Sequence, residues 1–421
     1  MKITLSEFEE SMGEATFPLA VAVSGGADSL ALLLLAHELA QKKGSHIVAL
    51  TVDHGLRPES KEEATRIGKW AKERGIEHVI LEWVDDKPTA RLQERARKAR
   101  YTLLTKWCRQ HQISTLLLGH HQQDQEETFW LRLSSGSGLD GLSGIKKCTV
   151  RDGILLLRPL LDFPKGRIKE TLLEQNQEWI EDPSNQSSRF FRGRFRRFLD
   201  EEGLSSVRLS QVMKKFQVDA DFIQEAVSKA IQESVQLHEG GYLTVKKESF
   251  NELHPAVAHR FLSFLLQWFS NKEYALRSIQ VTGMMDKIKR ESSFTAGGIY
   301  WTFSREEMLL TREKRALQQE LFVCSLQEKT LWDQRFWIDS RLSQYVPKES
   351  IIGPMGLIPG LKKEVKSPIP AQVWPTLPAL WEKGKVVAVP HLCYDLLKCG
   401  KDLSKFFYLK PLFHDSLRFT I

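Results

Sequence analysis

A glycine-rich string near the amino terminus is the first segment whose composition suggests chemistry. Ser24-Gly25-Gly26-Ala27-Asp28-Ser29 lies between the apolar run Leu19–Val23 and an apolar helical pattern. Without Cβ atoms at Gly25 and Gly26, the backbone can turn tightly and aim N–H groups at one anion, and a helix dipole with serine hydroxyls adds donors. The string therefore predicts a phosphate-binding loop, with an ordinary glycine turn as the alternative. It matches neither GxxxxGK[ST] nor GxGxxG.

Three acidic side chains could take part in binding or catalysis. Asp28 lies within the loop, and Asp124 and Glu127 lie in the polar segment 119–128. Mg²⁺ prefers carboxylate, water and phosphate oxygens, so Asp28 and Asp124 are the candidate metal ligands. Glu127 lies one helical turn beyond Asp124, where it could bind or deprotonate an amine. The alternatives are a helix cap for Asp28 and a solvated carboxylate for Glu127.

Four more polar residues directly follow expected strands. Asp53 and His54 come after the run Ile47–Val52, and His120 and His121 come after Thr115–Leu118. We expect Asp53, His54 and His120 to border a phosphate-containing ligand such as a nucleotide, and the imidazoles of His120 and His121 could touch a phosphate or a base. Either of Asp53 and His54 could instead only shape the turn before Gly55, and either histidine could be structural.

Two groups of arginines could neutralise phosphates. Arg97 and Arg100 are three residues apart and so share one helix face, where they could clamp a phosphate or form a solvated basic face. The stretch 189–198 holds five arginines and four phenylalanines in ten residues. Arginine with aromatic rings suits a splayed single-stranded RNA, which makes Arg192, Arg194 and Arg196 candidate contacts.

The elements that must position these residues form a pattern over the first 120 residues. Short β-branched runs at 19–23, 47–52, 78–81 and 115–118 alternate with helical patterns at 29–41, 59–74 and 91–110. This alternation predicts an α/β fold with a doubly wound parallel sheet, in which ligands bind beyond the carboxyl ends of the strands.

Two further domains are expected after this one. Helical periodicity at 204–234 and 255–269 and a hairpin at 297–311 indicate a mostly helical domain, and frequent Pro and Gly with a strand at 385–389 indicate a small α+β domain. The predicted boundaries are 1–200 for the nucleotide-binding domain, 201–318 for the helical domain and 330–421 for the carboxyl-terminal domain.

The composition indicates a globular protein and bears on its cellular compartment. The chain has 421 residues, a net charge of +7 and 42% hydrophobic residues, as in a globular protein. Its five cysteines include no CxxC pair, so neither a disulfide framework nor a zinc knuckle is expected. The amino terminus does not read as a signal peptide and no long apolar stretch occurs, which predicts a cytoplasmic protein without membrane contact.

The loop string resembles the PP-loop, or N-type ATP pyrophosphatase, superfamily, which adenylates an oxygen and releases pyrophosphate. Together with five further segments it closely resembles the tRNA(Ile)-lysidine synthetase family. These segments are Asp53–Arg57, Arg97–Tyr101, Gly119–Thr128, Arg158–Leu161 and Trp179–Asn185, followed by the basic run. The resemblance covers at least residues 19–200.

The resemblance implies a ligase that uses ATP, Mg²⁺ and free L-lysine. ATP would adenylate the carbon 2 oxygen of the wobble cytidine in isoleucine tRNA with a CAU anticodon, and lysine would then displace AMP to form lysidine. Asp28, Arg97, Asp124, Glu127 and Arg194 would be catalytic, and Arg100, His121, Arg192 and Arg196 would contact the tRNA. The helical and carboxyl-terminal domains would also bind tRNA. The protein could form a homodimer.

Three positions depart from the family pattern. Gln123 stands where the family has Asp, Ser135 where it has Arg, and Gly193 where it has Asn. These departures bear on the rate of catalysis and leave two alternatives open: a catalytically impaired tRNA-binding homologue, or another PP-loop adenylating synthetase.

Overall fold

The computed structural model describes residues 1–13, 15–56, 59–84, 92–181, 206–270, 278–317, 320–326, 329–359, 361, 365–397 and 402–410. The chain divides into two compact units, Met1–Asp221 and Phe222–His414. Helix α9 (Ser206–Ser234) contributes residues to both units. Among the described residues, no helix is both long and apolar enough to span a bilayer.

Unit 1 is built on a six-stranded sheet with the order β3-β2-β1-β4-β6-β5. The first five strands are parallel, and β5 pairs antiparallel with β6 at the edge. The four predicted strands are confirmed to within one residue at each end, whereas β5 and β6 were not predicted. The strands are β1 (Leu19–Ala22), β2 (Ile47–Asp53), β3 (Glu77–Glu82), β4 (Thr115–Leu117), β5 (Cys148–Arg151) and β6 (Ile154–Leu157).

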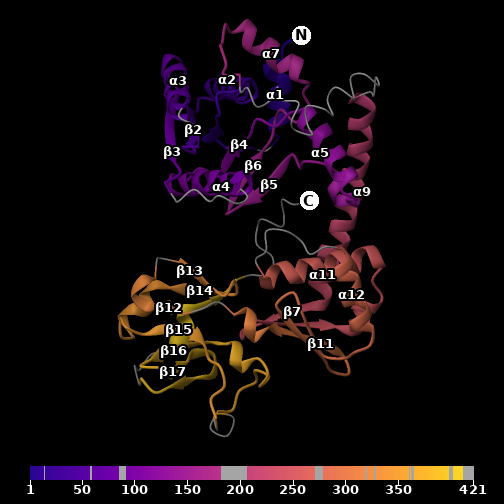
Figure 1. The fold of residues 1–421 in the computed structure, drawn as a ribbon, viewed down its shortest axis with the longest axis vertical. Coiled ribbons are helices and arrows are strands. Elements are labelled where there is room, and N and C mark those ends of the chain that lie inside the picture. The colour runs from indigo at the N-terminus through magenta and orange to yellow at the C-terminus, as the bar shows by residue number, and fades with distance from the viewer. Residues whose placement is uncertain are drawn as a thin grey trace. The chain divides into compact units, whose positions relative to one another are not determined.

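Helices cover both faces of this sheet, as Figure 1 shows. Because side chains alternate along a strand, Leu19 and Val21 of β1 join the core under α1, α2, α3 and α7, while Ala20 joins the core under α4. The predicted doubly wound α/β fold is therefore confirmed. The helices are α1 (Leu5–Met12), α2 (Ala27–Lys42), α3 (Ser60–Glu73), α4 (Leu92–Gln110), α5 (Gln122–Ser134), α6 (Leu139–Leu142) and α7 (Lys165–Glu174).

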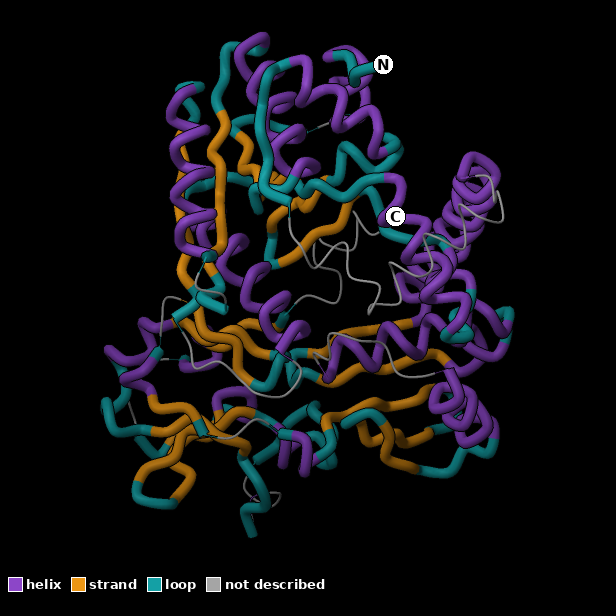
Figure 2. Tube along the Cα trace, turned by 45° about the horizontal axis from the view of Figure 1, so that its top comes forward, coloured by secondary structure: helices purple, strands orange, loops and turns teal. Residues whose placement is uncertain are grey.

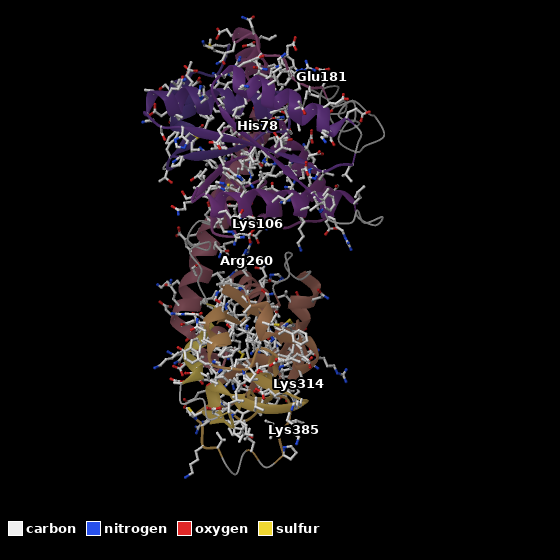
Figure 3. All side chains as sticks on the ribbon, turned by 90° about the vertical axis from the view of Figure 1, so that its left-hand side faces the viewer. His78, Lys106, Glu181, Arg260, Lys314 and Lys385 are labelled. Atoms are coloured by element: carbon white, nitrogen blue, oxygen red, sulfur yellow. The ribbon has the colours of Figure 1, made fainter. Side chains whose placement is uncertain are left out.

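A polar side chain on β3 is hydrogen-bonded to the neighbouring strand β2. His78 on β3, labelled in Figure 3, lies 2.8 Å through Nε2 from the Oγ1 atom of Thr51 on β2. Burial lowers the pKa of His78, which keeps the ring neutral at physiological pH. This histidine is thus structural.

The strand order reverses between β1 and β4. The chain proceeds from β1 to β2 and β3 on one side, and then returns to place β4 on the other side of β1. In a parallel sheet this arrangement separates the two connections at the carboxyl ends of the strands and leaves a crevice for a ligand. The segments after β1 and β4 therefore border one site.

The amino-terminal part of unit 2 combines helices with a five-stranded antiparallel sheet ordered β7-β8-β11-β10-β9. Helix α11 and the β10–β11 hairpin were predicted, but α10, α12, β7, β8 and β9 were not. The helices are α10 (Lys247–Asn251), α11 (Pro255–Ser270) and α12 (Ser278–Lys289), and the strands are β7 (Val235–His238), β8 (Tyr242–Lys246), β9 (Phe294–Ala296), β10 (Ile299–Phe303) and β11 (Glu307–Arg312).

The remainder of unit 2 consists mainly of strands, drawn orange in Figure 2. One sheet has the order β12-β15-β16-β17-β18 and another β13-β14-β19. The predicted strand at 385–389 is confirmed as β17. The strands are β12 (Leu321–Phe322), β13 (Lys329–Trp332), β14 (Phe336–Asp339), β15 (Ile351–Pro354), β16 (Pro378–Glu382), β17 (Lys385–Val389), β18 (Tyr394–Asp395) and β19 (Phe407–Leu409).

Short 3-10 helices connect several of these strands. They are η2 (Lys314–Ala316), η3 (Val323–Ser325), η4 (Ser340–Gln344), η5 (Trp374–Thr376), η6 (Pro390–Leu392) and η7 (Leu403–Phe406).

A buried ionic cluster joins segments of unit 2. Asp333 accepts from Nε of Arg312 at 3.1 Å and from Nε of Arg335 at 2.8 Å. Arg335 is fully buried and also donates to the carbonyl oxygens of Gly241 and Thr376. The cluster thus connects the hairpin before β8 with the turn between β13 and β14 and with η5.

Removing the charge of Asp333 should destabilise unit 2 strongly. In Asp333→Asn two buried guanidinium groups lose their counter-ion, which typically costs about 3–5 kcal/mol. The control Asp339→Asn removes an exposed pair with Arg341 and should cost less than about 1 kcal/mol. Equal losses for both variants in chemical denaturation would contradict this assignment.

A second buried group makes the stability of unit 2 depend on pH. Burial and the charge of Arg335 lower the pKa of His391 to about 4, and its Nδ1 atom is buried without a hydrogen-bond partner among the described residues. The unfolded chain binds this proton near the ordinary value of 6.5. Between these two pKa values the unfolded state therefore holds more protons than the folded state, so stability falls as the pH decreases.

Replacing His391 should remove this pH dependence. Relative to His391→Leu, the native chain should lose roughly 2 kcal/mol of unfolding free energy between about pH 7 and about pH 5. Denaturation curves at both pH values give the difference. Parallel pH profiles for the two proteins would show that His391 titrates normally in the folded state.

Candidate active site

The glycine loop after β1 leads directly into α2. Gly25 has a φ of +83°, and a Cβ atom there would lie 2.7 Å from Cδ1 of Ile180. The Ser29 hydroxyl accepts from the Ser24 N–H at 3.1 Å and donates to the Gly26 carbonyl at 3.0 Å, which fixes the turn. The N-cap residue of α2 is Gly26, which has no side chain to cap the helix. The first N–H groups of α2 are therefore available to an anion.

The start of α2 packs against the end of β4. A Cβ atom on Gly119 would lie 3.1 Å from backbone atoms of Asp28 and Ser29. Only glycine allows this approach without displacing the helix terminus, because the neighbouring atoms belong to the backbone. Gly119 therefore sets the distance between the loop and the segment after β4.

His121 bridges two acidic residues that lie far apart in the sequence. Its Nε2 atom is 3.5 Å from Oδ2 of Asp28 and 3.8 Å from Oδ2 of Asp124. Its Nδ1 atom accepts from the Gln123 N–H, and the Asp124 side chain accepts from the His121 N–H, so the group also caps α5. The structure thus brings Asp28, His121 and Asp124 together.

These contacts shift the pKa values of the group. Burial would raise the pKa of Asp28, but the hydrogen bond and charge of His121 lower it overall. Burial would lower the pKa of His121, but the hydrogen bond to Asp28 and the charges of both carboxylates raise it overall. The bond that Nδ1 accepts from Gln123 places the ring proton of the neutral form on Nε2, facing the carboxylates.

Asp28 has capacity for a further ligand. Its Oδ1 atom is buried and has no hydrogen-bond partner among the described residues. The described residues contain no cluster of three or more His, Cys, Asp or Glu able to hold a metal ion. Asp28 and Asp124 could therefore hold Mg²⁺ only together with water or phosphate oxygens, which is how proteins usually bind this ion.

A pocket of about 660 Å³ lies beside this group. Helix α5 contributes Asp124, Glu127 and Thr128, and the segment after β4 contributes His120. The complete lining is Arg97, His120, Asp124, Glu127, Thr128, Arg132, Asp140, Gly144, Ile145, Lys146, Thr149 and Arg158. Four residues predicted from the sequence, Arg97, His120, Asp124 and Glu127, thus share one cavity.

Arginines gather beside this pocket around Tyr101. The guanidinium groups of Arg97 and Arg100 lie 5.3 and 5.7 Å from the centre of its ring. Burial would raise the pKa of Tyr101, but the positive charges of Arg97, Arg100 and Arg158 lower it overall. Burial, followed by these same charges, lowers the pKa of His120 to about 3. His120 is therefore neutral at physiological pH.

The residues after β2 form a turn. Oδ1 of Asp53 accepts from the Gly55 N–H at 2.8 Å and from the Ser60 hydroxyl at 2.7 Å, and these bonds lower the pKa of Asp53. His54 lies edge-on to Trp83, with ring centres 6.1 Å apart. Asp53 thus shapes the turn, and its predicted place beside the nucleotide stays a prediction.

Several other residues singled out in the sequence lie outside the pocket lining or outside the described residues. Arg100 has a buried Nε atom without a hydrogen-bond partner among the described residues, but it does not line the pocket. Gln123 likewise has a buried, unpartnered Oε1 atom, whereas the Ser135 hydroxyl donates to the Leu131 carbonyl at 2.7 Å. Arg192, Gly193, Arg194 and Arg196 lie outside the described residues.

Sequence reasoning did not assign a role to most residues of the pocket wall. Arg132 donates hydrogen bonds to the carbonyl oxygens of Gly141 and Gly144 and so holds the segment around α6. Arg158 directly follows β6. Strands β4 and β6 are parallel neighbours, so His120 and Arg158, which follow their carboxyl ends, lie at the same end of the sheet. The Arg158–Leu161 motif was the signal that could have identified it.

The fold and the loop define the class of protein. A family model described as a PP-loop domain matches residues 2–202, which contain the glycine loop, His121 and the pocket. The chain is therefore a PP-loop ATP-binding protein.

Relatives of known function extend the similarity beyond this domain. A tRNA(Ile)-lysidine synthase of Wolbachia pipientis wMel is 34% identical over 395 residues, which is 90% of this chain and 89% of the relative. The enzyme of the same name from Orientia tsutsugamushi (strain Boryong) is 30% identical, with 89% of each chain covered. The one from Ruegeria pomeroyi (strain ATCC 700808 / DSM 15171 / DSS-3) is also 30% identical, with 88% of each covered. This chain belongs to the tRNA(Ile)-lysidine synthase family.

Enlarging Gly119 should weaken nucleotide binding. In Gly119→Ala the new methyl group must displace the start of α2, so we expect roughly tenfold weaker ATP binding in a calorimetric titration. Gly166→Ala, in α7 with nothing within 4 Å of the added Cβ, is the control and should bind ATP normally. Unchanged affinity in Gly119→Ala would contradict the close packing described here.

Proposed function

We propose that this protein joins free L-lysine to carbon 2 of the wobble cytidine of isoleucine tRNA with a CAU anticodon, using ATP. The observation that carries the proposal is the similarity to tRNA(Ile)-lysidine synthases over about nine tenths of the chain. The PP-loop and the pocket beside it supply the groups that the reaction needs. The product, lysidine, changes codon reading from AUG to AUA.

The first step forms an adenylated cytidine. The carbon 2 oxygen attacks the α-phosphorus of ATP, and the bond to the β-phosphate breaks to release pyrophosphate. The loop 24–29 binds the leaving pyrophosphate through N–H groups and hydroxyls at the start of α2. Asp28 and Asp124 hold Mg²⁺, which offsets the phosphate charge, and the unpartnered Oδ1 atom of Asp28 supports this role.

The second step transfers lysine. The ε-amine of lysine, after losing a proton, attacks carbon 2, and AMP leaves with the oxygen. Glu127 is buried in the pocket wall, where it binds the ammonium or accepts its proton. His120 stays neutral because of burial and the neighbouring arginines, so it can donate or accept a hydrogen bond without adding charge.

The tRNA is bound by basic residues and by unit 2. Arg97 and Arg100 on α4 contact phosphate, and His121 approaches the target nucleotide. Arg192, Arg194 and Arg196 bind the anticodon region, Arg194 also takes part in catalysis, and the domains at 201–318 and 330–421 hold the rest of the tRNA. Support comes from the net charge of +7 and from the unpartnered Nε atom of Arg100.

Lysine incorporation tests the proposed function. Purified protein with ATP and Mg²⁺ should attach radiolabelled lysine to isoleucine tRNA with a CAU anticodon, but not to methionine tRNAs with the same anticodon. Asp28→Ala should lower the rate roughly 100-fold or more, because it removes a charge aimed at the phosphates. Asp162→Ala removes an exposed carboxylate paired with Lys214 and should retain activity.

The same assay distinguishes the alternatives. Salt-sensitive tRNA binding without labelling would indicate a catalytically impaired homologue, with the Gln123, Ser135 and Gly193 departures as its cause. ATP cleavage without any dependence on tRNA would indicate another PP-loop adenylating synthetase.

A further inference from the structure

Arg158 is a buried cation whose hydrogen-bond donors are only partly used by the described residues. Its side chain is only 6% exposed. Nη1 donates to the Lys146 carbonyl at 2.8 Å and to Oγ1 of Thr149 at 3.2 Å. The Nε atom is buried without a hydrogen-bond partner in the part of the chain that the structure describes. Arg158 is also hydrogen-bonded through its side chain to Tyr101. These bonds fix the guanidinium group at the pocket wall but leave its Nε–H donor unused among the described residues.

Arg158 also has no ionic partner within the part of the chain that the structure describes. Among the described residues, no carboxylate lies within ion-pair distance of its guanidinium group. Burial lowers its pKa, but an arginine remains charged at physiological pH. A buried charge without a counter-ion is costly, so it is usually retained where a ligand supplies the opposite charge. The alternative is a purely structural role in bonding the 146–149 segment.

The charges of the pocket indicate what kind of ligand this is. Asp124, Glu127 and Asp140 contribute carboxylates to the same lining. Arg97, Arg132, Lys146 and Arg158 contribute positive charges beside them, and no residue of the phosphate-binding loop 24–29 lines the pocket. A ligand with one carboxylate and separate amino groups matches both signs of charge. Free lysine, a substrate of the proposed reaction, has this composition.

We propose that Arg158 binds the α-carboxylate of the lysine substrate and thereby determines the choice of an amino acid over a simple amine. This inference rests on the proposed lysine transfer. The guanidinium group would donate to the carboxylate oxygens, while Glu127 on α5 and Asp140 on α6 receive the amino groups. The carboxylate would fix one end of the substrate, so that the ε-amine is held for attack on carbon 2.

The test compares lysine with 1,5-diaminopentane, which is lysine without its carboxylate. In Arg158→Gln, the catalytic efficiency for lysine should fall roughly 10- to 100-fold, mainly through a higher KM. The efficiency for the diamine should not change, because it never had the carboxylate. Adenylation of the tRNA in the absence of lysine should proceed at the native rate.

Two variants separate binding from folding. Arg151→Gln removes an arginine that lies 5.0 Å from the ring centre of Tyr101 but does not line the pocket, so its lysine-to-diamine ratio should be native. If Arg158→Gln does not fold, Arg158→Lys provides the same comparison, because it retains the charge but loses the paired donors. Its lysine-to-diamine ratio should fall below the native ratio.

Three results would overturn the inference. Equal losses for lysine and the diamine would show that Arg158 only supports the pocket wall. Loss of adenylation with an unchanged KM for lysine would assign Arg158 to the nucleotide. Absence of lysine transfer by the native protein would reject the proposed function, and this inference with it.

Discussion

The close contact between the start of α2 and the end of β4 is the constraint on which the site depends. The reversal of strand order places these two segments side by side, and Gly119 lets their backbones approach each other. As a result, Asp28 from the loop and Asp124 from α5 reach the same nitrogen of His121. Residues separated by almost a hundred positions thus form one charged group, without any side chain spanning a long distance.

The pocket beside this group has a different electrostatic character from the phosphate-binding loop. The loop offers N–H groups and hydroxyls, which suit a highly charged anion. The pocket combines acidic residues of α5 with arginines, of which Arg158 is buried, and its histidine is kept uncharged by burial and by neighbouring arginines. The pocket therefore suits a ligand that carries both signs of charge.

The sequence predicted the elements whose signal is local. The glycine loop and four of the five parallel strands of unit 1 were identified because β-branched runs, glycines and helical periodicity occur within short windows. Strands β7, β8 and β9 were missed because their short runs adjoin long helical patterns. Antiparallel pairing stabilises them, β7 with β8, β8 with β11 and β9 with β10. Similarly, no sequence pattern displays that Arg158 lacks an ionic partner among the described residues, because this follows from the fold.

The ionic cluster of unit 2 has a consequence for how this family can diverge. Arg312, Asp333 and Arg335 are all buried, and each satisfies a charge or a carbonyl that another segment leaves exposed to the core. A single replacement leaves an uncompensated charge, whereas replacing the whole set with apolar side chains can be neutral. Over evolutionary time, these three positions should therefore be inherited as a unit and be exchanged together or not at all.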